Sequence, residues 1–272
     1  TALLAGVTKK VGIYAIIRLG FTVFAELELS ADLALPGVSG TGVLGYFGPL
    51  LFVAAAASIV LGGIAATNRD ELEFVFAYSS IGQVGFIVLP LAVAATATDP
   101  AITTLGIAAT LVYALNHALA KSLLFLVSGS LRTEVGSTRL SELGGLAGAQ
   151  PVLSGSFLVG ALALIGVPPL LGFFGKLFVF DTATRARIAG EPAAVLALAI
   201  ALLGAVLTIA YLSRVWNRAF WGEPSELIAN TRISRTMLAV LVGLALVGSL
   251  LGAIGSAVVR RLGNPVGKYR LL

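Results

Sequence analysis

The chain has 272 residues, of which 58% are hydrophobic and only 11% are charged, whereas about a quarter of the residues of a soluble domain are charged. This composition excludes an ordinary soluble domain and is typical of an integral membrane protein. The sequence contains no cysteine, one histidine and one methionine, so we expect no disulfide, no metal site and no cofactor. The formal net charge is +5, but the basic residues are scattered along the chain, so we expect no nucleic-acid partner.

Seven apolar stretches are long enough to cross a bilayer, which takes roughly 20 residues of α-helix. Apolar runs such as 51–60 and 192–207 are hydrophobic on every face, whereas the strands of a membrane β-barrel alternate. We therefore predict an all-α polytopic membrane protein, with residues 1–272 forming a single transmembrane domain. In chain order the predicted spans are residues 2–28, 45–67, 72–97, 101–131, 151–181, 191–221 and 233–259.

Glycines within the spans predict close helix packing. Gly62 and Gly63 are adjacent in one span, and Gly82 and Gly85 are three residues apart in the next. Small residues at such spacings let two helix backbones approach one another. The chain begins at Thr1, inside an apolar stretch without a charged leader, so we also expect it to be part of a longer protein.

His117 and Lys121 lie near the middle of the predicted span 101–131. A charge at that depth costs about 2.5–3.5 kcal/mol, which makes each such residue a functional candidate. Four residues apart, the two share one helix face. A histidine titrates near neutral pH, and a lysine in a low dielectric releases its proton more readily than one in water, so the pair suits a proton relay. Structural hydrogen bonding to neighbouring helices is the alternative.

Lys176 closes a segment that cannot form a continuous helix. Pro168, Pro169 and Gly172 precede it, and they interrupt the backbone hydrogen bonds and leave carbonyls to be satisfied by protein or water. Broken helices beside an ionisable residue mark ion sites in transporters. The alternative is a kinked helix whose terminal lysine reaches the membrane interface.

Two further groups of polar residues lie within the spans. Lys10 follows Lys9 in the first span, where either lysine could instead reach the interface. A polar stripe is formed by Ser79, Ser80 and Gln83. It could hold water, or its side chains could instead form hydrogen bonds between helices. No carboxyl group lies centrally in any predicted span; Asp181 comes closest to Lys176, and we expect it at the interface. The lysines are therefore often uncharged or find their partners in other sequence.

Five segments, in this order, resemble the antiporter-like membrane subunits shared by respiratory complex I and the Mrp-type multisubunit sodium/proton antiporters. The resemblance implies a fourteen-helix fold of two inverted five-helix repeats, each with a discontinuous helix, of which this chain holds the eighth helix onward. The segments are residues 8–14 (TKKVGIY), 77–85 (AYSSIGQVG), 116–125 (NHALAKSLLF), 141–146 (SELGGL) and 166–176 (GVPPLLGFFGK).

The resemblance also implies roles for individual residues. It aligns four basic residues with the proton path of the family; we call them the basic row: Lys10, His117, Lys121 and Lys176. The family's essential glutamate and its partner lysine belong to the first repeat, outside this chain. In one respect the chain departs from the family: the loop before residue 77 usually carries a basic pair, whereas residues 70–74 read DELEF. Any contact of that loop with an acidic neighbour is therefore in doubt.

The resulting hypothesis is a proton-translocating subunit of a multisubunit monovalent cation/proton antiporter in the cell membrane, not itself an enzyme. Its expected partners are other subunits, protons, sodium ions and the lipid bilayer. Residues 210–223 look most like the D-type Mrp subunits, and Lys176 argues against the complex I paralogue that has glutamate there. The alternative is the equivalent pump subunit of complex I. A transporter for an organic solute and a purely structural scaffold are further classes; a scaffold would tolerate loss of Lys121 and Lys176.

Overall fold

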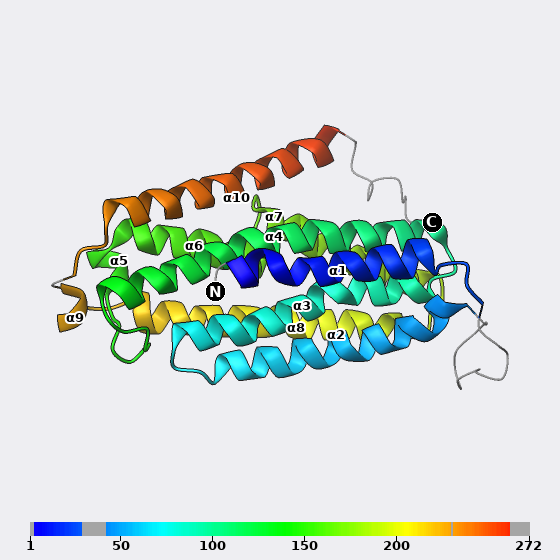
Figure 1. Cartoon of the computed structure of the whole chain (residues 1–272), viewed down its shortest axis with the longest axis horizontal. Helices are drawn as coiled ribbons and strands as arrows, with labels where there is room; N and C mark the ends of the chain where they lie inside the picture. Colours follow the sequence, from blue (N-terminus) through cyan, green and yellow to red (C-terminus); the bar gives the residue numbers. More distant parts are fainter. Residues whose placement is uncertain (1–2, 29–41, 230, 262–272) are drawn as a thin grey trace.

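The computed structural model describes residues 3–28, 42–229 and 231–261, whose helices lie along the longest axis of the molecule (Figure 1). The first helix consists of α1 (Lys9–Arg18) flanked by the π-helical segments η1 (Leu4–Thr8) and η2 (Leu19–Val23). The following elements are α2 (Val43–Thr67), α3 (Leu72–Thr96), α4 (Pro100–Glu134), α5 (Leu146–Ala149), α6 (Pro151–Ile165), α7 (Leu171–Ile188), α8 (Ala194–Val215), η4 (Trp216–Phe220), α9 (Glu226–Ala229) and α10 (Arg235–Arg261).

Among the described residues, five helices are long and apolar enough to cross a membrane: α2, α3, α4, α8 with η4, and α10. The predicted span 151–181 is divided between α6 and α7, as the Pro-Pro-Gly pattern indicates, although α7 continues to Ile188. The first predicted span is helical over Leu4–Val23. The structure thus confirms the all-helical, polytopic class.

Close glycine packing joins α2 to α3, as predicted. A Cβ atom added at Gly62 would lie 2.4 Å from the backbone nitrogen of Gly82, and one added at Gly85 would lie 2.5 Å from the carbonyl oxygen of Ala55. No side chain fits at either position without moving backbone. α10 lies at the edge of the bundle (Figure 1), where it contacts α4, α6 and α7.

The buried apolar residues form two clusters at different levels of the bundle. One cluster includes Phe76 of α3 and Leu124 of α4; the other includes Phe86 of α3 and Tyr113 of α4. Between these levels, the same helices carry the polar residues that the sequence analysis singled out. A band of buried polar side chains therefore lies between the two apolar clusters: Ser79, Ser80, Gln83, Asn116, His117, Lys121, Lys176 and Thr208.

The break between α6 and α7 has a defined geometry. Gly166 ends α6 with φ +93°, a left-handed conformation that glycine adopts without strain. The N–H groups of Gly166 and Val167 both donate to the carbonyl of Leu162, at 2.9 and 3.0 Å. The following prolines, Pro168 and Pro169, have no N–H to donate. The helix therefore stops, and α7 starts afresh at Leu171.

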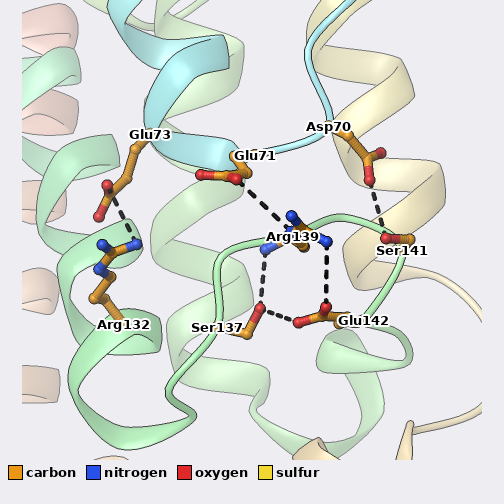
Figure 2. Close-up of polar contacts among 8 residues, drawn as sticks. All are labelled: Asp70, Glu71, Glu73, Arg132, Ser137, Arg139, Ser141 and Glu142. Carbon is orange, nitrogen blue, oxygen red and sulfur yellow. Dashed lines mark hydrogen bonds and ion pairs between the residues drawn. The ribbon is translucent and has the colours of Figure 1, made fainter.

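The acidic loop between α2 and α3 is neutralised by neighbouring segments of the same chain (Figure 2). The backbone also joins it to the loop after α4, because the Leu140 N–H donates to the carbonyl of Asp70 at 2.7 Å. Since the pairing side chains are largely exposed, each ion pair contributes about 1 kcal/mol or less. Asp70 lies 3.6 Å from both Arg214 and Arg218, Glu71 lies 3.7 Å from Arg139, and Glu73 lies 3.6 Å from Arg132.

Candidate functional site

α4 carries His117 and Lys121 into the middle of the bundle. The helix begins sharply because the Asp99 carboxylate accepts from the Ala101 N–H at 2.8 Å and Pro100 occupies its first turn. Over its 35 residues it extends about 52 Å, so its centre lies far from either end. The side chains of His117 and Lys121 are both 0% exposed.

Lys121 is hydrogen-bonded to α3. Its ammonium group donates to the carbonyl of Phe76 at 3.0 Å and to the hydroxyl of Ser79, and it lies 5.7 Å from the centre of the Phe76 ring. The hydroxyl of Ser80 donates to the same carbonyl at 2.7 Å. Ser79 therefore bonds to Lys121 directly, and Ser80 bonds to the backbone carbonyl that Lys121 also contacts.

His117 lies one turn before Lys121, and neither of its ring nitrogens has a hydrogen-bond partner among the described residues. Lys9 and Lys10 are close enough to interact with it electrostatically. The N-terminal helix reaches α4 closely, because a Cβ added at Gly6 would lie 3.3 Å from the carbonyl oxygen of Ala118. Lys10 is partly buried there, whereas Lys9 is exposed.

Lys176 lies where α7 passes the break. It is 5% exposed, and its Nζ atom has no hydrogen-bond partner among the described residues. Nζ lies 4.8 Å from the centre of the Phe86 ring, and a Cβ added at Gly166 would lie 3.0 Å from Lys176 Cδ. The aliphatic part of the Lys176 side chain therefore packs against the break at Gly166. Asp181 does not reach it and pairs instead with Arg185 at 3.1 Å.

Asn116, next to His117, satisfies one of the carbonyls that the break leaves free. Its Nδ2 atom donates to the carbonyl of Ala163 at 3.2 Å. Gly172 lies against the same carbonyl, because an added Cβ would come within 1.7 Å of the Ala163 oxygen. The break is therefore fixed against the middle of α4, directly beside His117.

Three residues that the sequence analysis did not select surround Gln83. The hydroxyl of Tyr113 donates to Gln83 Oε1, and Gln83 Nε2 donates to Thr208 Oγ1 at 3.0 Å and to the Tyr211 hydroxyl at 2.9 Å. All four side chains are buried, and we call them the Gln83 cluster. The available sequence signal was Thr208 and Tyr211, two polar residues three positions apart in an apolar span.

The predicted site residues thus come together as a polar band across the bundle. The N-terminal helix places Lys10 against α4, which holds His117 and Lys121; α3 adds Ser79 and Gln83; and Lys176 follows beyond the Gln83 cluster. Pro168 and Pro169 contribute only the break itself. Among the described residues, no group of three or more His, Asp or Glu side chains is arranged to hold a metal ion.

These features define a class: polytopic helical membrane proteins with a discontinuous helix and basic side chains buried at mid-bundle. Within that class, the chain belongs to the family described as NADH:quinone oxidoreductase/Mrp antiporter, TM, whose model matches residues 1–208. The family resemblance of the five sequence segments is therefore confirmed.

Two curated relatives fall on the two branches of that family. The chain is 30% identical over 242 residues to the D-type subunit of the Na+/H+ antiporter of Alkalihalophilus pseudofirmus, which covers 88% of this chain and 43% of that protein. It is 34% identical over 219 residues to the N-type subunit of the NADH-quinone oxidoreductase of Desulforudis audaxviator, which covers 80% of this chain and 38% of that protein. The chain thus spans less than half the length of either relative.

Solved structures agree on the fold. A chain in the structure of the Mrp complex from Dietzia sp. matches with a TM-score of 0.75 at 23% identity, over 94% of this chain and 50% of that chain. A chain of the membrane-bound sulfane sulfur reductase, an archaeal respiratory membrane complex, matches with a TM-score of 0.76 at 27% identity, over 93% of this chain and 38% of that chain.

Proposed function

We propose that this chain is part of a proton-translocating membrane subunit of a multisubunit monovalent cation/proton antiporter. Protons move along the basic row of Lys10, His117, Lys121 and Lys176, and other subunits of the same complex, sodium ions and the lipid bilayer are its partners. The chain would form one transmembrane unit, the second inverted repeat and the helices after it. The observation that carries the proposal is the burial of three basic side chains at one level of the bundle.

That burial is costly whenever the groups are charged. A charged group far from water pays a large desolvation penalty, which a paired carboxylate usually offsets. The buried charged residues of the described chain are all basic, with no carboxylate among them. A row of groups that can be charged one at a time avoids the penalty of charging all of them together, which is how a stepwise proton relay operates.

A proton-pumping subunit of complex I is the second candidate, and the 34% identity to the NADH-quinone oxidoreductase relative supports it. The residues of the basic row serve both proposals, so partners decide between them. Purification of the native complex tests this: small Mrp-type subunits support the antiporter, and quinone-binding and iron–sulfur subunits support complex I.

The relay itself is tested by Lys121→Met in the complete complex, reconstituted into liposomes and driven by a sodium gradient. Methionine keeps the length of the side chain and removes its ability to carry a proton. We expect proton flux to be lost while the complex still assembles. Arg187→Met is the control, because Arg187 is an exposed basic residue in the last turn of α7 and is not part of the row. Equal flux in both variants would contradict the proposal.

A further inference from the structure

The Gln83 cluster lies between Lys121 and Lys176. On one side, Ser79 is one helical turn before Gln83 and accepts a hydrogen bond from Lys121. On the other side, Tyr113 packs against Gly175, the residue before Lys176: an added Cβ at Gly175 would lie 2.7 Å from Tyr113 Cδ2. The ring of Tyr113 lies 5.8 Å from that of Phe86, the ring over which Lys176 Nζ lies. A proton passing from one lysine to the other therefore meets this cluster.

The side-chain amide of Gln83 is fully engaged in the cluster. Its oxygen accepts from Tyr113, and its nitrogen donates to both Thr208 and Tyr211. Thr208 in turn donates to the carbonyl of Gly204 at 2.7 Å. A carboxamide has a fixed acceptor and two fixed donors and neither takes up nor releases a proton near neutral pH. In this arrangement the amide interrupts any chain of groups that exchange protons.

Hydroxyl groups and water behave differently, because each can accept one proton while it donates another. Beside Gln83 is a small cavity of about 10 Å³ whose polar lining is Ser79, Gln83, Thr208 and Tyr211. Its volume is close to what a single water molecule needs, and the polar lining supplies hydrogen-bond partners. Tyr113 does not line this cavity, but its hydroxyl donates to Gln83 Oε1, so water that takes the place of the turned amide would connect the cavity beside Ser79 with the Tyr113 hydroxyl.

We propose that Gln83 controls proton transfer between Lys121 and Lys176, closing the route while it is bonded to Tyr113 and opening it when water takes its place. In the open state, the ammonium of Lys121 gives up one proton and the amine of Lys176 gains one. Ser79, water and Tyr113 each accept one proton and release another, so no charge remains on the cluster. This inference rests on the proposed relay.

The test uses the complete complex in proteoliposomes and measures two quantities: proton flux driven by a sodium gradient, and passive proton leak under an imposed pH gradient without sodium. Gln83→Leu fills the space with apolar atoms and excludes water, so we expect it to lower the driven flux by about a hundredfold. Gln83→Ala leaves space for water without the amide, so we expect leak above that of the unmodified complex. Adding Lys176→Ala to Gln83→Ala should remove that leak.

Gln150→Leu is the matched control. Gln150 also donates an amide hydrogen bond between segments, to the carbonyl of Thr231 at 2.8 Å, but it lies outside the polar band. We expect it to behave as the unmodified complex in both measurements. If both Gln83 variants match Gln150→Leu in driven flux and in leak, at equal amounts of assembled complex, then Gln83 only holds the helices together by hydrogen bonds and the inference is wrong. A leak in Gln83→Ala that persists without Lys176 also overturns it.

If Gln83→Leu fails to assemble, the leak of Gln83→Ala still tests the inference, because the alanine variant removes atoms and adds none. Failure of the relay gives a different result. Full sodium-driven flux in Lys176→Ala, with Gln83 intact, would overturn the proposed function whatever the Gln83 variants do.

Discussion

Gly172→Ala is expected to disrupt the break between α6 and α7. The added methyl group would lie 1.7 Å from the carbonyl oxygen of Ala163 and 2.9 Å from Asn116 Nδ2. The first of these contacts is with backbone, which cannot move aside as the end of a flexible side chain can. To accommodate the methyl group, α7 must move away from the end of α6.

The magnitude follows from two contributions. Overpacking of a filled interior costs about 1–3 kcal/mol. The displaced carbonyl also loses the hydrogen bond from Asn116, which contributes about 1 kcal/mol. The sum of about 2–4 kcal/mol corresponds, at about 2–4 °C per kcal/mol, to a fall of about 4–16 °C in the midpoint of thermal unfolding.

The assay is thermal unfolding of the purified complex, followed by tryptophan fluorescence, together with sodium-driven proton flux. Gly155→Ala is the matched control: it lies within α6, and an added Cβ meets nothing within 4 Å. Since alanine favours a helix over glycine by about 0.5–1 kcal/mol, this variant should be at least as stable as the unmodified complex. Equal midpoints and equal flux for the two variants would refute the packing argument.

Two further predictions concern the row and the loop. His117→Ala should change the pH profile of transport more than the amount of assembled complex, because it removes a side chain that can take up and release a proton; parallel loss of protein and flux at every pH would instead indicate a structural role. Asp70→Asn should change the free energy of unfolding by about 1 kcal/mol or less, because the Asp70 side chain is 43% exposed and lies 3.6 Å from its two arginines; a large loss of stability in thermal unfolding would contradict this.

Hydrophobic runs were sufficient to predict the five long helices α2, α3, α4, α8 with η4, and α10, because a run of about 20 apolar residues leaves few alternatives to a membrane helix. The break was equally readable, since Pro168 and Pro169 remove two consecutive donors. The shared face of His117 and Lys121 followed from helical periodicity alone. These are local properties, each determined by residues within a few turns of one another.

Contacts between distant segments could not be derived in this way. Gln83 bonds to Thr208, 125 residues further along the chain, and nothing near either residue indicates the other. The same holds for Asp70 and the arginines of α8 and η4, which neutralise a loop that the sequence alone left without a partner. Gly172 was recognised as part of the break, but its approach to Ala163 depends on how α6 and α7 pack.

The most direct test of the relay is sodium-driven proton flux by Lys176→Arg and Lys176→Ala in proteoliposomes, at matched amounts of assembled complex. We expect both variants to lose flux: alanine carries no proton, and a guanidinium group keeps its charge but scarcely releases a proton in a protein. Near-normal flux in the alanine variant would contradict the account, because Lys176 would then only anchor α7. Normal flux in the arginine variant alone would show that positive charge, and not proton exchange, is what this position requires.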